Sequence, residues 1–436
     1  MRIGNGVRTV SWLAAVIAAV GVLTACGTDV DDITVGRGLG WPAPGHEARN
    51  SANTPVTGSR ALSLQWSRPV GGPIVQPVTV GSEGQIFLTT STDANCEIFS
   101  YQMRTGRKRF CNPLGPHSIY SPTILDGASN VYVGLDSAVE SANQLGQPRW
   151  RTAVAGVPTG MQFTGDGHLL VITQSGQVDV LERQTGKRMV PTQQLLPRPD
   201  FLQDPGQDWP PAGAGLEDCR TGGPDCPVAT VAAMDIDAGR IYATVRKPGA
   251  PKASLVALRY ADGKVQQEWS TDLLIDGSAT DPALSADGST LYIGDNSKRL
   301  LAVNTTDGTP KWEAHLDWEP RRGISVSDDG LVIPAGDDGY LLALRDTGNS
   351  YERVWERKDL ELRGSPVQTA GGTGYVTAAI GTGLNLVTFD TATGATLDSD
   401  VLPGAKGTTT GTAVGAEGEV VVATRIGEVF TFGEND

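Results

Sequence analysis

The chain contains 436 residues, of which 55 are glycine and 27 are proline; 39% are hydrophobic and only 19% are charged. So much glycine, together with dispersed aromatic residues, excludes a coiled coil and a disordered polyampholyte, because neither has the apolar content to build a core. The formal net charge of −14 does not supply the basic footprint that nucleic-acid binding requires. We therefore expect a globular, turn-rich protein that does not bind nucleic acid.

The first residues have the pattern of an export signal. Arg2 and Arg8 precede an apolar run over 10–23 that is too short for a membrane-spanning helix of about 20 apolar residues. The run ends in Leu-Thr-Ala before Cys26 and resembles a bacterial lipoprotein signal, which implies cleavage before Cys26 and acylation there, with palmitate among the acyl chains. An ordinary signal peptide with a chance cysteine and an uncleaved anchor are the alternatives. We predict a signal peptide over 1–25 and an exported protein, anchored by lipid to the outer face of the cytoplasmic membrane or within the cell envelope.

Residues 26–59 are rich in glycine, proline, asparagine and threonine and have no periodic apolar pattern. Such composition is typical of a linker, so we predict a flexible tether between lipidated Cys26 and a domain over 60–436. Gly36, Gly38 and Gly40 lie in this segment, but no strand precedes them and no helix pattern follows, so they do not indicate a phosphate-binding loop.

The remaining chain is one unit copied several times. A glycine turn recurs at intervals of 40 to 46 residues, with one gap of 77, at Gly106, Gly146, Gly186, Gly263, Gly308, Gly348 and Gly394. Each unit has short strands of β-branched, aliphatic and aromatic residues, and the strand after the glycine often carries an aromatic residue, as at Phe110, Trp150, Trp269, Trp312 and Trp355. Four short strands in a period near 40 predict an all-β fold, a β-propeller of four-stranded antiparallel blades.

The two ends of the chain complement each other. The C-terminal segment 412–433 has strands but stops before a fourth one, whereas residues 62–66 form an orphan strand with Trp66 at the fourth-strand aromatic position. Joining them would complete a blade and remove an exposed sheet edge. We therefore predict an eight-bladed, monomeric propeller that is closed by its N-terminal strand joining the C-terminal blade.

The long gap in the repeat is an insertion over 190–227, which contains eight prolines and shows no strand alternation. Four cysteines remain besides Cys26, and three pairings are possible. We favour the local pairs, because Cys96 and Cys111 flank a predicted hairpin and Cys219 and Cys226 would close a small loop. The four histidines are scattered and none has metal-ligand spacing to a cysteine pair, so no metal site is predicted.

The segment 300–312, with its Thr-Asp-Gly turn and Trp312, resembles the repeats of pyrroloquinoline-quinone-like propellers. Such repeats occur in quinoprotein alcohol dehydrogenases and in envelope-assembly lipoproteins of the BamB type. The dehydrogenases imply a vicinal disulfide, a tryptophan beneath the quinone, calcium ligands and an aspartate base. This sequence has no adjacent cysteines, and its repeated tryptophans fall where blade packing requires them. We therefore predict no catalytic residues and no cofactor.

Three tryptophans outside the signal do not fit the repeat, namely Trp41, Trp209 and Trp318. Trp209 lies in the insertion, and Trp318 precedes Arg321 and Arg322, so these four residues are candidates for contact with a partner protein. The alternative is that each tryptophan caps a blade. The prediction from sequence is a lipid-anchored, non-catalytic scaffold or accessory factor that binds envelope proteins in assembly or transport, with the disulfide-closed insertion as its docking element. A quinone- or carbohydrate-binding propeller with a dehydrogenase or sensory role is the alternative.

Overall fold

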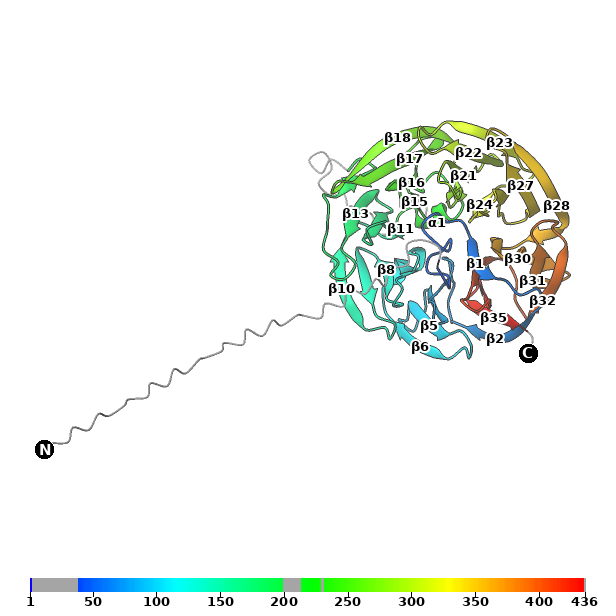
Figure 1. The fold of residues 1–436 in the computed structure, drawn as a ribbon, viewed down its shortest axis with the longest axis horizontal. Helices are drawn as coiled ribbons and strands as arrows, with labels where there is room; N and C mark the ends of the chain where they lie inside the picture. Colours follow the sequence, from blue (N-terminus) through cyan, green and yellow to red (C-terminus); the bar gives the residue numbers. More distant parts are fainter. Residues whose placement is uncertain (2–37, 199–212, 229–230, 435–436) are drawn as a thin grey trace. The chain divides into compact units, whose positions relative to one another are not determined.

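Four-stranded antiparallel sheets arranged around one axis dominate the computed structural model, which describes Met1 and residues 38–198, 213–228 and 231–434 (Figure 1). The chain divides into Met1–Asp31 and Asp32–Asp436, and all that follows concerns the second unit. No helix among the described residues is long and apolar enough to cross a membrane.

Six of the sheets are separate and contain four strands each. From the innermost strand outward, five of them are β3 (Thr79–Val80), β4 (Gln85–Thr89), β5 (Ile98–Gln102) and β6 (Lys108–Asn112); β7 (Ile124–Leu125), β8 (Val131–Leu135), β9 (Ala138–Ala142) and β10 (Pro148–Ala153); β11 (Pro158–Phe163), β12 (Leu169–Thr173), β13 (Gln177–Leu181) and β14 (Gln193–Gln194); β15 (Ala233–Asp235), β16 (Arg240–Val245), β17 (Lys252–Ala261) and β18 (Lys264–Ile275); and β20 (Ala283–Leu284), β21 (Thr290–Asp295), β22 (Arg299–Asn304) and β23 (Pro310–His315).

A nine-stranded sheet contains two more four-stranded sets and an added parallel strand. Its members are β25 (Ser325–Val326), β26 (Leu331–Ile333), β27 (Tyr340–Asp346) and β28 (Tyr351–Leu362); β29 (Val367–Ala370), β30 (Thr373–Ile380), β31 (Gly383–Asp390) and β32 (Thr396–Leu402); and β1 (Asn53–Thr57). Two short parallel strands, β19 (Ala279–Thr280) and β24 (Arg321–Arg322), lie between blades, and the only described helices are η1 (Pro116–Tyr120) and α1 (Leu216–Cys219).

The last four-stranded sheet joins the two ends of the chain, as predicted. Its order is β2 (Leu62–Pro69), β35 (Glu428–Glu434), β34 (Val420–Thr424) and β33 (Thr409–Val414), and β2 runs antiparallel to β35 with Leu62 opposite Glu434. The predicted β-propeller fold and its closure by the N-terminal strand are therefore confirmed. The pairing of β2 leaves no open edge on β35, which removes a site for edge-to-edge association.

The repeated glycines and tryptophans lock neighbouring blades together. A Cβ built on Gly308, which has φ +75°, would lie 2.7 Å from Cε3 of Trp269 in the preceding blade. The indole nitrogens of Trp150, Trp269 and Trp355 donate to the backbone oxygens of Arg183, Thr305 and Thr391 at 2.8, 3.1 and 2.9 Å. Gly308 thus supplies both the positive φ of its turn and the space for the tryptophan of the preceding blade.

The predicted tether is wrong for the part that the structure describes. Residues 38–57, which we call the axial segment, pack along the axis, and β1 at its end runs parallel to β29 (Figure 1). Trp41, His46 and Asn50 are at most 1% exposed. The segment lacks periodicity because it contacts one blade after another rather than a single sheet face, so alternation is not required of it. Residues 2–37 lie outside the described residues.

Candidate functional site

The axial segment occupies the centre of the ring by bonding to the innermost strands of successive blades. Backbone nitrogens of the blades donate to backbone oxygens of the segment: Leu125 donates to Pro42 at 2.8 Å, Met234 to Ala48 at 2.6 Å, Leu284 to Arg49 at 2.9 Å, Val326 to Ser51 at 2.7 Å and Gln368 to Ala52 at 3.0 Å. Trp41 exchanges a pair of backbone bonds with Val80, and the side chain of Gln162 donates to Asn50 at 3.0 Å. One short stretch of chain therefore contacts seven of the four-stranded sets.

Trp41 anchors the start of this segment. Its side chain is 1% exposed, its indole nitrogen donates to the backbone oxygen of Pro44 at 3.1 Å, and its ring centroid lies 4.9 Å from that of His46. His46 and Asn50 both have positive φ, at 79° and 53°, which non-glycine residues adopt only where the surrounding contacts enforce it. Trp41, one of the three tryptophans that do not fit the repeat, is thus a structural anchor. Packing was the alternative to partner contact for these tryptophans.

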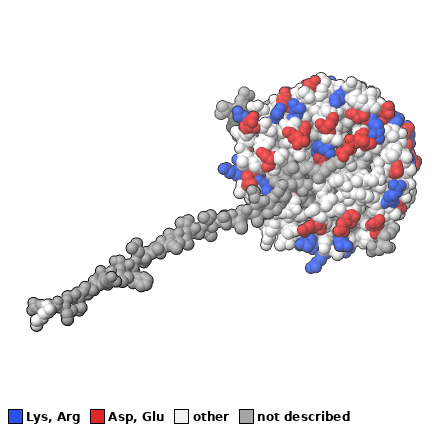
Figure 2. Space-filling view, in the orientation of Figure 1, with Lys and Arg blue, Asp and Glu red and all other residues white. Residues whose placement is uncertain are grey.

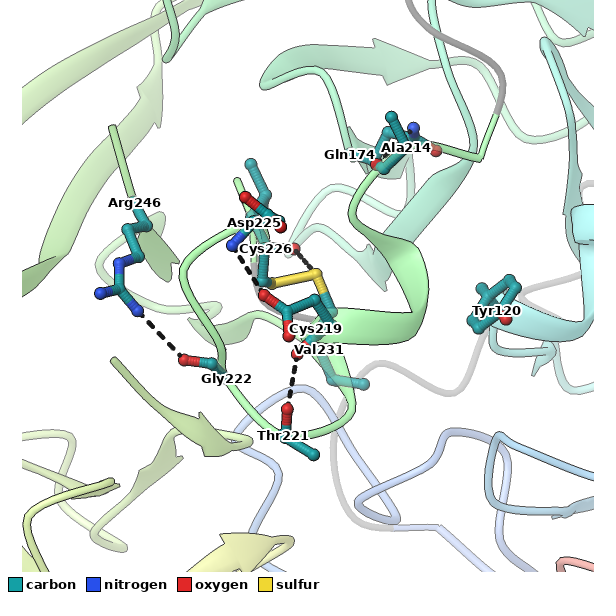
Figure 3. The surroundings of a disulfide bond; sticks show 12 residues. Tyr120, Gln174, Ala214, Cys219, Thr221, Gly222, Asp225, Cys226, Val231 and Arg246 are labelled. Atoms are coloured by element: carbon teal, nitrogen blue, oxygen red, sulfur yellow. Dashed lines mark hydrogen bonds between the residues drawn. A yellow bond between two sulfur atoms is a disulfide. The ribbon is translucent and has the colours of Figure 1, made fainter. Parts of the chain in front are cut away.

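The predicted insertion begins too early, because residues 193–194 form β14, the fourth strand of a blade; residues 213–228 form a small disulfide-closed loop (Figure 3). Cys219 at the end of α1 is bonded to Cys226, and both side chains are at most 5% exposed. Asp218 accepts a hydrogen bond from the backbone nitrogen of Asp225 at 2.6 Å, which spans the same loop. We call residues 213–228 the disulfide loop.

The disulfide loop is bonded to several blades. Arg246 donates to Gly222 at 3.3 Å (Figure 3). Tyr120 in η1 donates to Glu217 at 3.0 Å, Gln174 donates to Ala214 at 3.2 Å, and Asn296 donates to Thr221 at 2.9 Å. These partners lie in connections between blades or in turns between the second and third strands of a blade. The loop is therefore built into the ring, which limits the predicted docking role of the insertion to surfaces outside this packed part.

A cavity of about 50 Å³ lies between the disulfide loop and the blades, and we call it the axial pocket. Its polar lining side chains are Gln76, Arg220, Asp281, Arg322, Thr410 and Arg425. A second, smaller cavity of about 20 Å³ shares Pro77, Asp281 and Thr410 with it and reaches Trp41 and Asn50 of the axial segment. The two cavities thus run along the axis between the disulfide loop and the axial segment.

Three guanidinium groups dominate the charge of the axial pocket. Burial, aided by the neighbouring cations of Arg322 and Arg220, lowers the pKa of Arg425 to about 9. Burial also lowers the pKa of Arg322, although Nη2 of this arginine lies 2.9 Å from both carboxylate oxygens of Asp337. Nη1 of Arg322 and Nε of Arg425 are buried and have no hydrogen-bond partner among the described residues. The pocket therefore presents uncompensated N–H donors in a positive environment.

The predicted partner-binding residues have different fates. Trp318 is only 6% exposed and packs on the backbone of Gly339 and the ring of Tyr340, so it caps a blade rather than offering an exposed contact. Arg321 pairs with Glu319. Arg322 has φ +66° and points into the axial pocket, with its side chain 11% exposed. The prediction of a partner-binding surface at Trp318 and Arg322 is therefore wrong, because both are buried.

Other predicted site residues lie elsewhere or outside the described residues. Cys26 and Trp209 are outside them. Cys96 is bonded to Cys111 across the β5–β6 hairpin with a Cα–Cα distance of 5.5 Å, so both local disulfides are present. The described residues contain no group of three or more His, Cys, Asp or Glu side chains placed to hold a metal ion.

Neither Arg220 nor Arg425 was identified from the sequence. Arg425 lies in the turn between β34 and β35, and the sequence of this turn resembles the other turns of the ring. Charged residues follow the second strand in other repeats as well, at Asp136 and Arg246, so the charge of Arg425 gave no signal without knowledge of which turns face the axis. On the face shown in Figure 2, acidic and basic side chains are interspersed over the ring rather than gathered by sign.

A family model described as outer membrane protein assembly factor BamB matches residues 230–435. Protein Rv3035 of Mycobacterium tuberculosis (strain ATCC 25618 / H37Rv) is 35% identical over 414 residues, which cover 93% of this chain and 99% of that protein.

Two solved structures are similar at low sequence identity. Quinohemoprotein alcohol dehydrogenase from Comamonas testosteroni has a TM-score of 0.63 and 14% identity over 92% of this chain and 82% of its own. BamB from Moraxella catarrhalis has a TM-score of 0.59 and 17% identity over 86% of this chain and 100% of its own. At these identities the likeness shows the propeller fold and not the activity.

Proposed function

The chain belongs to the BamB-like family of PQQ-type β-propellers, and on this premise we propose that it is a non-catalytic scaffold or accessory factor for protein assembly or transport in the cell envelope. One observation carries the proposal: the centre of the ring is filled by the chain's own axial segment. A propeller whose centre is occupied in this way offers its rim and faces for contact instead of an axial site for a drug-sized ligand.

The cavity volume also bears on the quinone alternative. Sites for drug-sized ligands have volumes of roughly 300–1,000 Å³, whereas the axial pocket has about 50 Å³ and the smaller cavity about 20 Å³. The sequence also has no adjacent cysteines to form a vicinal disulfide. The axial residues therefore do not fit a tricyclic quinone, and we derive no reaction step through one. The alternative rests on the structural likeness to a quinohemoprotein alcohol dehydrogenase.

The proposed location follows from the first residues and from the family. The Leu-Thr-Ala sequence before Cys26 supports acylation, and the description of the matching family model supports a place outside the cytoplasm. Intact-mass analysis of protein extracted from membranes tests this. We expect a mass that corresponds to cleavage before Cys26 plus acyl chains, and loss of membrane retention in Cys26→Ser. Retention of that variant at the membrane would contradict the anchor.

The scaffold proposal predicts specific partners that co-purify with the mature protein. Three exposed apolar side chains are candidate contacts: Ile380 and Ile426 beside turns between second and third strands, and Val401 near the end of the outer strand β32. They are 40%, 62% and 59% exposed. A pull-down from membranes would compare Val401→Asp and Ile426→Asp with Leu145→Asp, because Leu145 is equally exposed, at 56%, but lies in the turn between β9 and β10. We expect envelope proteins to be retained by the wild type and the Leu145 variant.

Two outcomes would refute the scaffold proposal. One is the absence of any envelope protein that is retained reproducibly by the wild type and lost on competition with untagged protein. The other is a new absorbance band that stays with the purified protein after addition of pyrroloquinoline quinone and calcium, because such a band would favour the quinone alternative.

A further inference from the structure

The axial pocket contains charged donors that the protein itself does not satisfy. Arg322 is held on one side by Asp337, at 2.9 Å from Nη2, while its buried Nη1 has no partner among the described residues. Nε of Arg425 is likewise buried and has no hydrogen-bond partner among the described residues. Both groups line the same cavity. Buried guanidinium donors are normally paired, so their position calls for an acceptor in the cavity.

The third cation comes from the disulfide loop. Arg220 follows α1 directly and lines the axial pocket, and it is bonded to Glu217 through Nε at 2.9 Å. It lies close enough to Arg322 and Arg425 to lower the pKa of both. Because the loop is closed by a disulfide between Cys219 and Cys226 and bonded to three blades and to η1, Arg220 is carried on a fixed element rather than on a free loop.

The acidic groups at the pocket do not accept hydrogen bonds from Nη1 of Arg322 or from Nε of Arg425. Asp337 is engaged by Arg322, and Asp281 accepts the backbone nitrogen of Val231 at 3.3 Å. Arg322 is moreover held at φ +66°, a left-handed backbone conformation that is rare for arginine and that clusters at ligand-binding positions.

We propose that the axial pocket is a binding site for a small, free oxyanion with two negative charges, held by Arg322 and Arg425 with Arg220 at its edge. The volume of about 50 Å³ has room for a few water molecules or for one such anion. Planar guanidinium groups suit the paired oxygens of phosphate and carboxylate groups. This site goes beyond the scaffold function, and partner binding can fail or succeed independently of it.

Calorimetric titration and thermal unfolding of the full mature protein test the site, with inorganic phosphate as one probe and malonate as the other. The protein is first dialysed into a buffer that is free of both, and chloride keeps the ionic strength constant. We expect one anion per chain and a rise of the melting temperature with anion concentration. The probe that binds more tightly decides between phosphate and carboxylate chemistry.

Arg425→Gln is the discriminating variant, because it removes an unpaired buried charge and should not lower the melting temperature of the anion-free protein. We expect it to weaken anion binding by about tenfold or more, as the loss of a charge-assisted hydrogen bond does. Arg425→Lys should retain part of the affinity. The matched control is Arg353→Gln, because Arg353 is 46% exposed on the rim strand β28. The anion affinity of this variant should equal that of the wild type.

Absence of heat and of a melting shift with both probes would overturn the proposal. Equal affinities of Arg425→Gln and the wild type would also overturn it, because the anion would then bind elsewhere. If Arg425→Gln does not fold, the anion affinities of Arg425→Lys and Arg353→Gln are compared instead. Equal affinities of these two variants would overturn the proposal.

Discussion

The contact between Gly308 and Trp269 allows the energy of one blade interface to be isolated. Gly308→Ala forces a Cβ to within 2.7 Å of the Trp269 ring at φ +75°. Gly263 occupies the equivalent turn of the preceding blade, has φ +67°, and an added Cβ there meets nothing within 4 Å. Gly263→Ala therefore has the backbone cost alone and serves as the matched control.

The magnitudes separate the two variants. A left-handed alanine costs about 1–2 kcal/mol of folding free energy in either turn. Gly308→Ala adds overpacking of about 1–3 kcal/mol. If Trp269 moves away, the 3.1 Å bond from its indole nitrogen to Thr305 is lost as well, which costs about 1 kcal/mol. We expect Gly308→Ala to be less stable than Gly263→Ala by at least about 1 and up to about 4 kcal/mol.

Urea unfolding followed by tryptophan fluorescence and by circular dichroism measures the difference. Adding Trp269→Phe to each variant completes a double-mutant cycle, in which coupling should appear with Gly308→Ala and not with Gly263→Ala. Equal destabilisation of the two glycine variants would refute the conclusion that the indole ring and the glycine form one interlocking contact.

Three further predictions concern other parts of the ring. Trp41→Ala should destabilise the protein by about 3–5 kcal/mol, as for other buried tryptophans, and should expose the axial segment to limited proteolysis; unchanged protease resistance would contradict its anchoring role. Deletion of 62–68 removes most of β2 and its pairing with β35, so the cooperative unfolding transition should disappear; a truncated protein that melts at the wild-type temperature would contradict closure. Burial and the neighbouring Asp398 raise the pKa of Asp400 to about 6, so the folded state binds more protons than the unfolded state between about pH 4 and 6. The contribution of Asp400 is present below that window and is lost as pH rises through it, and Asp400→Asn should increase the melting temperature at pH 7 but not at pH 4; equal shifts at the two pH values would refute the assignment.

The sequence was most informative where structure is local and repeated. The turn at Gly308 and the strand residue Trp312 recur at nearly constant spacing, which was enough to predict the four-stranded blades and the pairing of the two ends. The same pattern did not indicate that the glycine receives the tryptophan of the preceding blade, because that contact joins residues of different repeats.

Features that depend on the centre of the ring could not be predicted from local patterns. The axial segment has no periodicity, because each of its bonds goes to a different blade. Trp318 was expected to be exposed beside charged residues, but Gly339 and Tyr340, which lie further along the chain, cover it. Arg425 and Arg322 lie more than one repeat apart and meet only because the ring brings their turns to one pocket.

The axial segment also has a consequence for the order of folding. It is synthesised before every blade that it contacts, yet the backbone oxygen of Ser59 just beyond it accepts a bond from Tyr375, 316 residues later, and Leu62 donates to Asp398 across 336 residues. Within the segment, the oxygens of Ser51 and Ala52, which accept from Val326 and Gln368, are likewise unsatisfied until most of the chain is available. Such long sequence separation slows folding, so we expect the ring to close late, around the segment that was made first.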